Sequence, residues 1–407
     1  MFSINSSFPV NSGKFIIILT LVFALTRLLI KGRFTAHFDK KFIKIIFLGI
    51  SYIILVSATF QLVHGGGDFS LPYGFLIFLL EGFVGSLLVI SFYYGRENID
   101  VILRDLVDVA VFQAFIILAM LFSPEIREIL FSIQGDARED VFDRYGGFRG
   151  LGFSGSVVYD LAAIMGFAQI LITLDMRKSS RVFTGAILKW LLLLVAIAIT
   201  GRTGFLCSLV SLLLILFDGK KGKLQVLTIC MILGSFSYYL SLIAFMFFPE
   251  FDQSTFENII FYVTDLYVNG GTKSTDVLWE SLKIKDLSVF IFGMGVFNWD
   301  LVSNEVYRYY SDSGYIRHIY HHGFFITAAS VYLYMKLWAF VYRISRQFQP
   351  ELAVVVIAIA ILSLIIQVKG DFMFSSGINV KYSLILIVGV LSHYCIFYTK
   401  KSMTIKF

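Results

Sequence analysis

The chain has 407 residues, of which 57% are hydrophobic and only 15% are charged, and its mean hydropathy is +0.80. Because a soluble globular domain carries about 25% charged residues, this composition excludes an ordinary soluble enzyme. The net charge of +6 does not indicate a nucleic-acid partner, since the basic residues lie mostly in the connections between long apolar runs.

Apolar runs of about 20 residues recur along the chain, and runs of this length cross a bilayer as helices. We therefore expect an all-α polytopic membrane protein with about eleven transmembrane helices, within a range of about ten to twelve. Together they form a single membrane domain, residues 1–407, with a smaller loop at residues 123–153. A large loop, residues 249–318, lies between the eighth and ninth spans and is expected to be partly helical. The expected spans cover residues 14–30, 42–63, 73–94, 104–122, 154–175, 182–200, 203–217, 224–248, 319–342, 351–368 and 382–399.

Lysine and arginine gather on alternate connections, and the basic C-terminal tail belongs to the same set. By the positive-inside rule this face is cytoplasmic. The C-terminus is then cytoplasmic, and in a bacterium the opposite face is periplasmic. That opposite face carries both loops, the turn at residues 201–202 and the connection at residues 369–381.

A glycine-rich segment with Arg144 and Arg149 leads into the fifth span. Glycine lets backbone approach a ligand closely, and arginine binds phosphate through two nitrogens at once. In the alternative interpretation, the arginines pair with Asp140 or Asp143 beside an ordinary turn. The residues themselves leave both interpretations open.

The next candidate is Arg202, in the sequence Gly-Arg-Thr-Gly between two short apolar runs. This pattern predicts a helical hairpin with its tip on the outer face. The span that follows begins at Thr203, so its free N–H groups adjoin Arg202, and together they would form an anion site. In the alternative interpretation, Arg202 is a turn residue whose side chain only extends into water.

The large loop contains a pair of glycines followed by Lys273 and by a predicted helix that carries Trp279. Thr275 is a suitable residue to cap that helix, which has apolar residues at helical spacing. The loop is thus expected to supply both a cation and an aromatic side chain.

Further along the loop, a helix that starts near Asp312 would place Tyr315, His318 and His322 on one stripe. The two histidines could bind zinc, but no Cys or Glu completes a ligand set at the usual spacing. The three cysteines lie inside apolar runs and are expected to pack there. We therefore expect no metal and no other cofactor, and a structural or interfacial histidine cluster.

Several ionisable residues lie within expected spans, where charge is costly and suggests a function by default. They are scattered, and no inverted repeat of broken helices accompanies them, so a carrier is the second interpretation. These residues are Glu81, Asp160, Lys189, Lys336 and His393.

The order of these features resembles the bacterial O-antigen polymerases, within the wider O-antigen ligase and polymerase superfamily. The resemblance covers the topology of most of the chain, and its matching motifs are short. In the ligase branch a histidine occupies roughly the position of Asp312, which favours the polymerase branch here. The residues that carry the resemblance are Arg202 in its Gly-Arg-Thr turn, Lys273 before the helix of Trp279, residues 293–295, then Asp312, Gly314 and Tyr315, and the closing Gly323.

This resemblance implies a membrane glycosyltransferase in the bacterial inner membrane. It would transfer a growing glycan from undecaprenyl pyrophosphate to a lipid-linked repeat unit at the periplasmic face. Such a reaction must stabilise a departing diphosphate and take a proton from an acceptor hydroxyl. The implied partners are the undecaprenyl-pyrophosphate-linked oligosaccharide and membrane lipid, together with a chain-length regulator and a flippase.

On this interpretation each candidate residue has a role. Arg202 and Arg149 would hold the pyrophosphate, with Arg144 and Lys273 assisting them. Asp312 or His318 would be the base, and Tyr315 and Trp279 would stack on sugar faces. The alternatives left open are an O-antigen ligase, a lipid-linked glycan flippase or other transporter, and a non-catalytic scaffold or receptor.

Overall fold

Nearly all the residues that the structure describes lie in helices. It is a computed structural model, and it describes residues 18, 22, 26, 33–36, 40–64, 69–90, 99–134, 152, 158–178, 184–201, 203–247, 286–295, 311, 313–373, 378–395 and 403–406. Where the sequence predicted one membrane domain, the contacts group the chain into two compact units. The first consists mainly of residues 12–105 and 277–407, and the second of residues 106–276.

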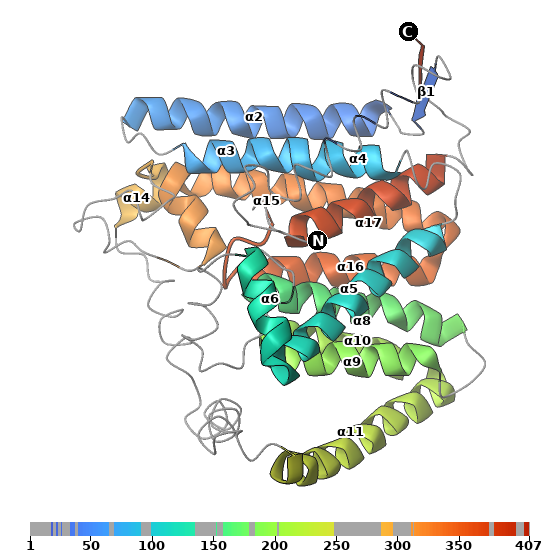
Figure 1. Ribbon diagram of the computed structural model, residues 1–407. Coiled ribbons are helices and arrows are strands. Elements are labelled where there is room, and N and C mark those ends of the chain that lie inside the picture. Colours follow the sequence, from blue (N-terminus) through green and yellow to red (C-terminus); the bar gives the residue numbers. More distant parts are fainter. Residues whose placement is uncertain are drawn as a thin grey trace. The chain divides into compact units, whose positions relative to one another are not determined.

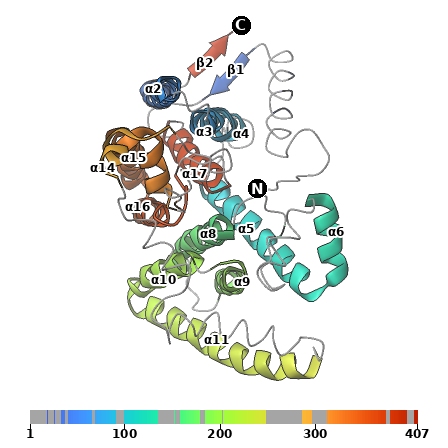
Figure 2. The same ribbon diagram turned by 90° about the vertical axis from the view of Figure 1, so that its left-hand side faces the viewer.

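The first unit is built from helices that lie along one another (Figures 1 and 2). A pair of four-residue strands, β1 (Arg33–Ala36) and β2 (Met403–Lys406), runs antiparallel beside them. Helix α5 (Ile99–Phe122) starts in this unit and continues into the second. The other elements are α2 (Lys40–His64), α3 (Ser70–Ile77), the π-helix η1 (Phe78–Val84), α4 (Gly85–Val89), α14 (Leu287–Phe292), α15 (Gly314–Phe348), α16 (Pro350–Ile366) and α17 (Ile378–Tyr394).

The helices of the second unit are α6 (Pro124–Gln134), α8 (Val158–Lys178), α9 (Gly185–Thr200), α10 (Thr203–Leu216) and α11 (Gly219–Phe247). Helices α9 and α10 form a hairpin, and both pack on α8 (Figure 2). Helix α8 is the core of the unit, since 89% of its most apolar stretch is buried.

A buried polar network joins α8, α9 and α10. Gln169 on α8 donates from its side-chain amide to the backbone oxygen of Trp190 (3.0 Å) and accepts from the Ser208 hydroxyl (2.6 Å). The Trp190 indole N–H donates to the Ser211 hydroxyl (2.8 Å). Because an unpaired polar group costs several kcal/mol in an apolar environment, this pairing specifies how α8, α9 and α10 face one another.

The close contact of α8 and α10 depends on Gly204, the last residue of the Gly-Arg-Thr-Gly turn. A Cβ atom there would lie 2.5 Å from the Ala162 carbonyl oxygen and 2.6 Å from a methyl group of Ile197. Gly204→Ala is therefore expected to cost about 1–3 kcal/mol of stability, the usual cost of overpacking. Thermal unfolding in detergent measures the loss. Gly185→Ala is the matched control, because a Cβ atom at Gly185 meets nothing within 4 Å, and an equal loss in both variants would contradict this account.

The positions of the helices agree with the sequence prediction, whereas the number of membrane spans is not confirmed. Each expected span after the first falls on a helix, and residues 14–30 lie outside the described residues apart from three single positions. Three described helices, Ser70–Val89, Tyr159–Lys178 and Gly314–Phe348, are long and apolar enough to cross a membrane. A fourth span results if Ile99–Leu121 and Pro124–Ser132, bent by 115°, count as one. The count of eleven stays a prediction.

The two loops are described only in part. The segment expected as a loop at residues 123–153 starts with the helix α6. Of the large loop, residues 286–295, 311 and 313–318 are described, and they contain α14 and the first turns of α15. The helix expected to begin near Asp312 is confirmed, since α15 begins at Gly314.

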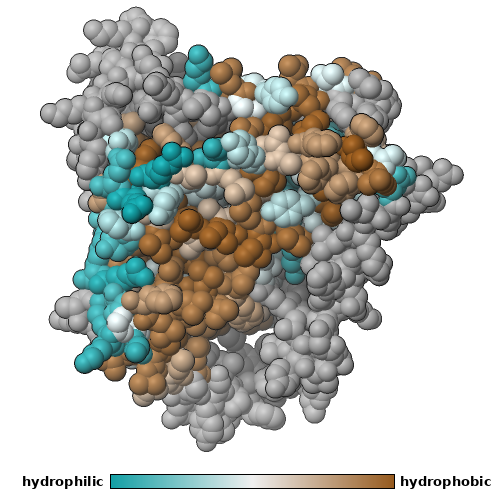
Figure 3. All heavy atoms as spheres, turned by 180° about the vertical axis from the view of Figure 1, so that it is seen from behind, coloured by the Kyte–Doolittle hydropathy of each residue, from teal (hydrophilic) through white to brown (hydrophobic). Residues whose placement is uncertain are grey.

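Large apolar side chains are exposed along many of these helices, among them Leu62, Phe115, Leu209 and Tyr332. Figure 3 shows large apolar areas on the described surface. A soluble monomer exposes few contiguous apolar areas of this kind. The exposed residues are those expected of helices whose outer faces meet lipid.

Candidate functional site

The candidate site lies where α15 is broken. Its backbone leaves the helical conformation at Gly323 (φ 82°, ψ 169°). This break divides α15 into a first arm, residues 314–322, and a second arm, residues 324–348. The span expected at residues 319–342 lies within α15, which starts earlier, at Gly314, and breaks at Gly323.

The Gly-Met-Gly segment at residues 293–295 caps the end of the first arm. The N–H of Met294 donates to the Tyr320 carbonyl (2.7 Å), and the N–H of Gly295 donates to the His321 carbonyl (2.9 Å). These bonds tie the segment to the last carbonyls of the first arm, where backbone groups at a helix end need partners from outside the helix. Helix α14 precedes the segment and lies beside the break (Figure 1).

The break requires glycine at position 323. The positive φ is costly for any residue with a Cβ atom, and a Cβ atom at Gly323 would lie 2.2 Å from the Ile291 carbonyl oxygen. Gly323→Ala is expected to cost about 1–3 kcal/mol from backbone strain alone and to lower the midpoint of thermal unfolding. Gly74→Ala is the control, because Gly74 lies in α3 with open space around it. A Gly323→Ala variant as stable as the wild type would contradict the assigned strain.

His318, on the first arm, is paired with Asp371 in the connection between α16 and α17. Its Nε2 atom lies 3.1 Å from Asp371 Oδ1, and the side chains are only 2% and 9% exposed. Gln367 donates from its side-chain amide to the same carboxylate oxygen (3.2 Å). The Gln367 side-chain oxygen in turn accepts from the N–H groups of Phe372 and Met373 (2.6 and 2.7 Å). The amide of Gln367 is therefore fixed at both ends, and it fixes the carboxylate.

The start of α15 is attached to the same residue. The N–H of Gly314 donates to the Gln367 carbonyl (3.0 Å). A Cβ atom at Gly314 would lie 2.5 Å from the Gly370 carbonyl oxygen and closer still to the Gln367 side chain. The backbone of the first arm is thus held against the α16–α17 connection, which sets the distance from His318 to Asp371.

The electrostatics keep Asp371 ionised. Burial by itself raises the pKa of a carboxyl group, but the charge and hydrogen bond of His318, the hydrogen bond from Gln367 and the charge of Arg317 outweigh it, so the pKa of Asp371 is lowered. An ionised carboxylate only accepts hydrogen bonds, so His318 Nε2 is the nitrogen that carries hydrogen. In the neutral form of His318, Nδ1 then carries the lone pair and is the atom that can accept a proton.

Two more histidines continue from this pair. The ring centroids of His318 and His322 are 5.6 Å apart, and those of His321 and His322 are 5.5 Å apart. All three side chains are buried. His322 Nε2 lies 3.4 Å from the Thr327 hydroxyl. Within the described residues, no group of three or more His, Cys, Asp or Glu side chains is arranged to hold a metal ion.

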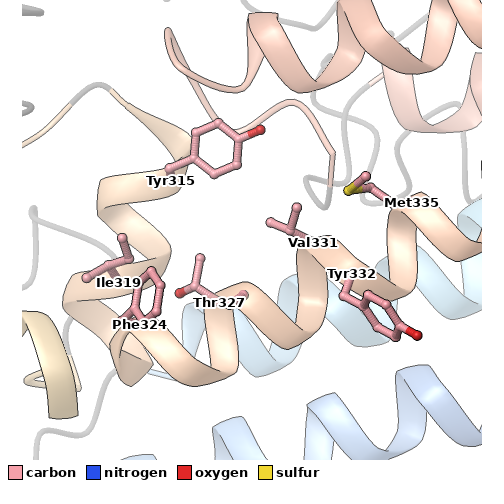
Figure 4. Close-up of a pocket in the computed structure, with 8 residues that line it drawn as sticks. Tyr315, Ile319, Phe324, Thr327, Val331, Tyr332 and Met335 are labelled. Carbon is pink, nitrogen blue, oxygen red and sulfur yellow. The ribbon is translucent and has the colours of Figure 1, made fainter.

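Tyr315 lies on the same first arm but lines a different space. Its hydroxyl donates to the Leu364 carbonyl (2.8 Å). Its ring lines an apolar groove of about 390 Å³ beside the break in α15 (Figure 4). The groove offers few polar groups to a sugar, and the sugar-stacking role of Tyr315 stays a prediction. Its other lining residues are Ile319, Phe324, Thr327, Ala328, Val331, Tyr332 and Met335.

The other predicted site residues lie outside the described residues. Close neighbours of two of them are described. Gly201 caps α9, with its N–H bonded to the Ile197 carbonyl (2.8 Å), and Gly204 packs α10 against α8. Gly152 of the glycine-rich segment has a φ of 53°, and a Cβ atom there would clash with Gln113 of α5. The residues outside are Asp312, Arg202, Arg149, Arg144, Lys273 and Trp279.

Sequence reasoning missed Asp371 and Gln367. The signal available was the assignment of residues 369–381 to the same face as the large loop, which agrees with the contact between Asp371 and His318. Several residues of this connection are polar or charged, and the sequence alone does not show which one meets the histidine.

Lys189 and Lys336, both inside expected spans, have partners in the structure. Lys189 forms a salt bridge with Asp108 (2.5 Å). The Lys336 ammonium lies 5.1 Å from the centroid of the Tyr332 ring, a cation–π contact. These pairings explain both lysines without a transport path.

The site is therefore a buried imidazole–carboxylate pair at the start of a broken helix. Comparison of the chain with models of known protein families and with curated protein sequences gave no match.

Proposed function

We propose that this chain is a polymerase of lipid-linked oligosaccharides, a membrane glycosyltransferase that makes O-antigen or a related surface polysaccharide. The observation that carries the proposal is the His318–Asp371 pair. Glycan transfer to a hydroxyl acceptor needs a base that takes the hydroxyl proton. A histidine oriented by a buried carboxylate is well suited to this step, and it lies in the segment that resembles the O-antigen polymerases.

The reaction breaks the bond between the anomeric carbon of the growing glycan and the pyrophosphate of its undecaprenyl carrier. The acceptor hydroxyl oxygen forms the new bond to that carbon, and its proton passes to His318 Nδ1. The leaving pyrophosphate keeps the bonding electrons. Arg202 and Arg149, assisted by Arg144 and Lys273, would stabilise this negative charge.

Of the two bases that the sequence suggested, we propose His318. Its Nε2 atom lies 3.1 Å from Asp371, an ionised partner that would stabilise the imidazolium once it forms. The His318 side chain is only 2% exposed, so the acceptor reaches it in a conformation in which covering residues have moved. Shielding of this kind keeps water from the activated sugar.

The topology that accompanies this function is the one expected from the sequence. About eleven spans would place the large loop, the hairpin tip at residues 201–202 and the connection at residues 369–381 in the periplasm. The C-terminus would be cytoplasmic. A lipid-linked donor and a lipid-linked acceptor would then meet at the outer face of the inner membrane, and a flippase and a chain-length regulator are the proposed partners.

The test is an assay with purified protein in proteoliposomes and undecaprenyl-pyrophosphate-linked repeat units. A polymerase yields carrier-linked products of two and more units, seen by gel electrophoresis and mass spectrometry. A ligase yields product only when lipid A core is added. A deletion strain gives the matching cellular result, since loss of the polymerase leaves a core with one repeat unit attached.

A lipid-linked glycan transporter is the second candidate, and one observation favours it. The row of buried histidines that begins at the His318–Asp371 pair resembles a proton relay, and buried ionisable groups of this kind occur in carriers. A transporter would move labelled lipid-linked units between leaflets without changing their length. Transport without longer products in the same proteoliposomes would select this function.

A further inference from the structure

Helix α14 is unusually apolar for a segment of the polar loop. Its sequence is Leu-Ser-Val-Phe-Ile-Phe, and none of its residues is buried. Asp286 caps it by accepting hydrogen bonds from the N–H and hydroxyl of Ser288 (2.8 and 2.7 Å). The polar groups at its start are therefore bonded to one another, and the rest of the helix presents apolar side chains.

One face of α14 packs on the first arm of α15. Val289, Phe290 and Met294 contact a buried cluster of Ile316, Ile319 and Tyr320. The face turned away leaves Leu287 66% exposed and Phe292 65% exposed. Leaving two large side chains exposed is costly in water, at about 25 cal/mol for each Å² of apolar surface.

These exposed residues continue onto α15. Gly293 and Gly323 are in backbone contact, which brings the end of α14 to the start of the second arm. Phe290 stacks on Phe324 with ring centroids 5.2 Å apart, and Phe324 meets Phe325 edge to face at 5.7 Å. We call the exposed set Leu287, Phe292, Phe324 and Phe325 the aromatic edge. Phe325 is 70% exposed and Phe324 is 42% exposed.

The length of the second arm of α15 sets the depth of this edge. On the topology expected from the sequence, Arg343 and Arg346 mark its cytoplasmic end. The stretch from Phe324 to Tyr342 measures about 28 Å at 1.5 Å per residue. The hydrocarbon core of a bilayer is about 30 Å thick. If Lys336 instead marks the cytoplasmic boundary, Phe324 lies deeper. In both cases the start of the second arm lies at or below the outer boundary of the hydrocarbon.

We propose that the aromatic edge is inserted in the outer interface of the bilayer, so that α14 anchors the large loop to the membrane. The occupant of this surface is lipid at the boundary between headgroups and acyl chains, where aromatic side chains gather. The argument is the continuity of the edge with the lipid-facing side of a candidate span. Because α14 has no basic residue, its insertion needs no anionic lipid. The inference does not depend on the proposed enzymatic activity.

Accessibility of nitroxide labels in proteoliposomes tests the proposal. Labels are placed by Leu287→Cys and Phe292→Cys in a Cys230→Ser background, since Cys230 is the exposed cysteine and Cys207 and Cys395 are buried. Met335→Cys, at an exposed position on α15, serves as the lipid reference. Lys220→Cys, at the basic start of α11, serves as the aqueous reference. All label sites are exposed, so the fold tolerates them.

At positions 287 and 292 we expect relaxation by oxygen to exceed relaxation by a water-soluble nickel complex, as at position 335 and opposite to position 220. The ratio should be the same in vesicles of phosphatidylcholine alone and in vesicles that also contain phosphatidylglycerol. A ratio like that of position 220 would overturn the proposal, because the edge would then face water. Exclusion of both probes would also overturn it, because protein, either the rest of the loop or a second copy, would then cover the edge. Dependence on phosphatidylglycerol would overturn the apolar account of binding.

Discussion

Replacement of His318 by glutamine is expected to reduce the rate of glycan transfer by about 100- to 10,000-fold, the usual contribution of a general base. Glutamine keeps the length and a hydrogen-bonding group of the side chain but cannot accept a proton. The rate is measured as the initial appearance of two-unit product from lipid-linked repeat units. The midpoint of thermal unfolding is measured on the same preparation, so that a loss of folded protein is not mistaken for a loss of catalysis.

His393→Gln is the matched control, because His393 is a histidine outside the site. It lies on α17, its ring is 5.0 Å from that of Phe348, and its Nδ1 atom faces the N–H of Ile99. This variant should keep the wild-type rate. If His318→Gln also kept it, His318 would not be the base and Asp312→Asn would become the decisive variant.

The helices could be predicted from the sequence because each is a long apolar run between charged connections. The expected span at residues 42–63, for example, matches α2 at Lys40–His64. The break in α15 could not be predicted in this way, because a single glycine within helical spacing does not by itself show that the helix breaks there. At the break, Gly323 is in backbone contact with Gly293, a residue 30 positions earlier in the chain, and local sequence does not indicate such a contact.

The candidate site could be predicted only in part, for a related reason. The helical stripe of Tyr315, His318 and His322 follows from spacing alone, and α15 has that spacing. The surroundings do not follow from spacing, since His318 is buried against Asp371 whereas Tyr315 faces an apolar groove. A contact between residues 53 positions apart depends on how the first arm docks on Gln367, which is a tertiary property.

Replacement of Asp371 by asparagine is expected to reduce the transfer rate by about 100-fold or more, since asparagine neither fixes the tautomer of His318 nor stabilises its imidazolium. The effect should fall on the rate at saturating substrate and leave the concentration for half-maximal rate nearly unchanged, because Asp371 acts through His318 and touches no substrate. Asp371→Glu keeps the charge and should recover part of the rate. A proportional loss of rate and of folded protein would instead indicate a purely structural role.

Asp371→Asn also tests the electrostatics of the pair, through the pH dependence of its stability. The folded-state pKa of Asp371 is lowered, so its ionised form stabilises the fold fully above the ordinary aspartate pKa of about 3.9. That contribution is lost as the pH falls through the lower folded-state value. The difference in unfolding midpoint between wild type and Asp371→Asn should therefore narrow as the pH falls below about 4. A difference that did not narrow there would mean that the carboxylate charge does not stabilise the pair, and the case for an ionised Asp371 holding His318 would fail with it.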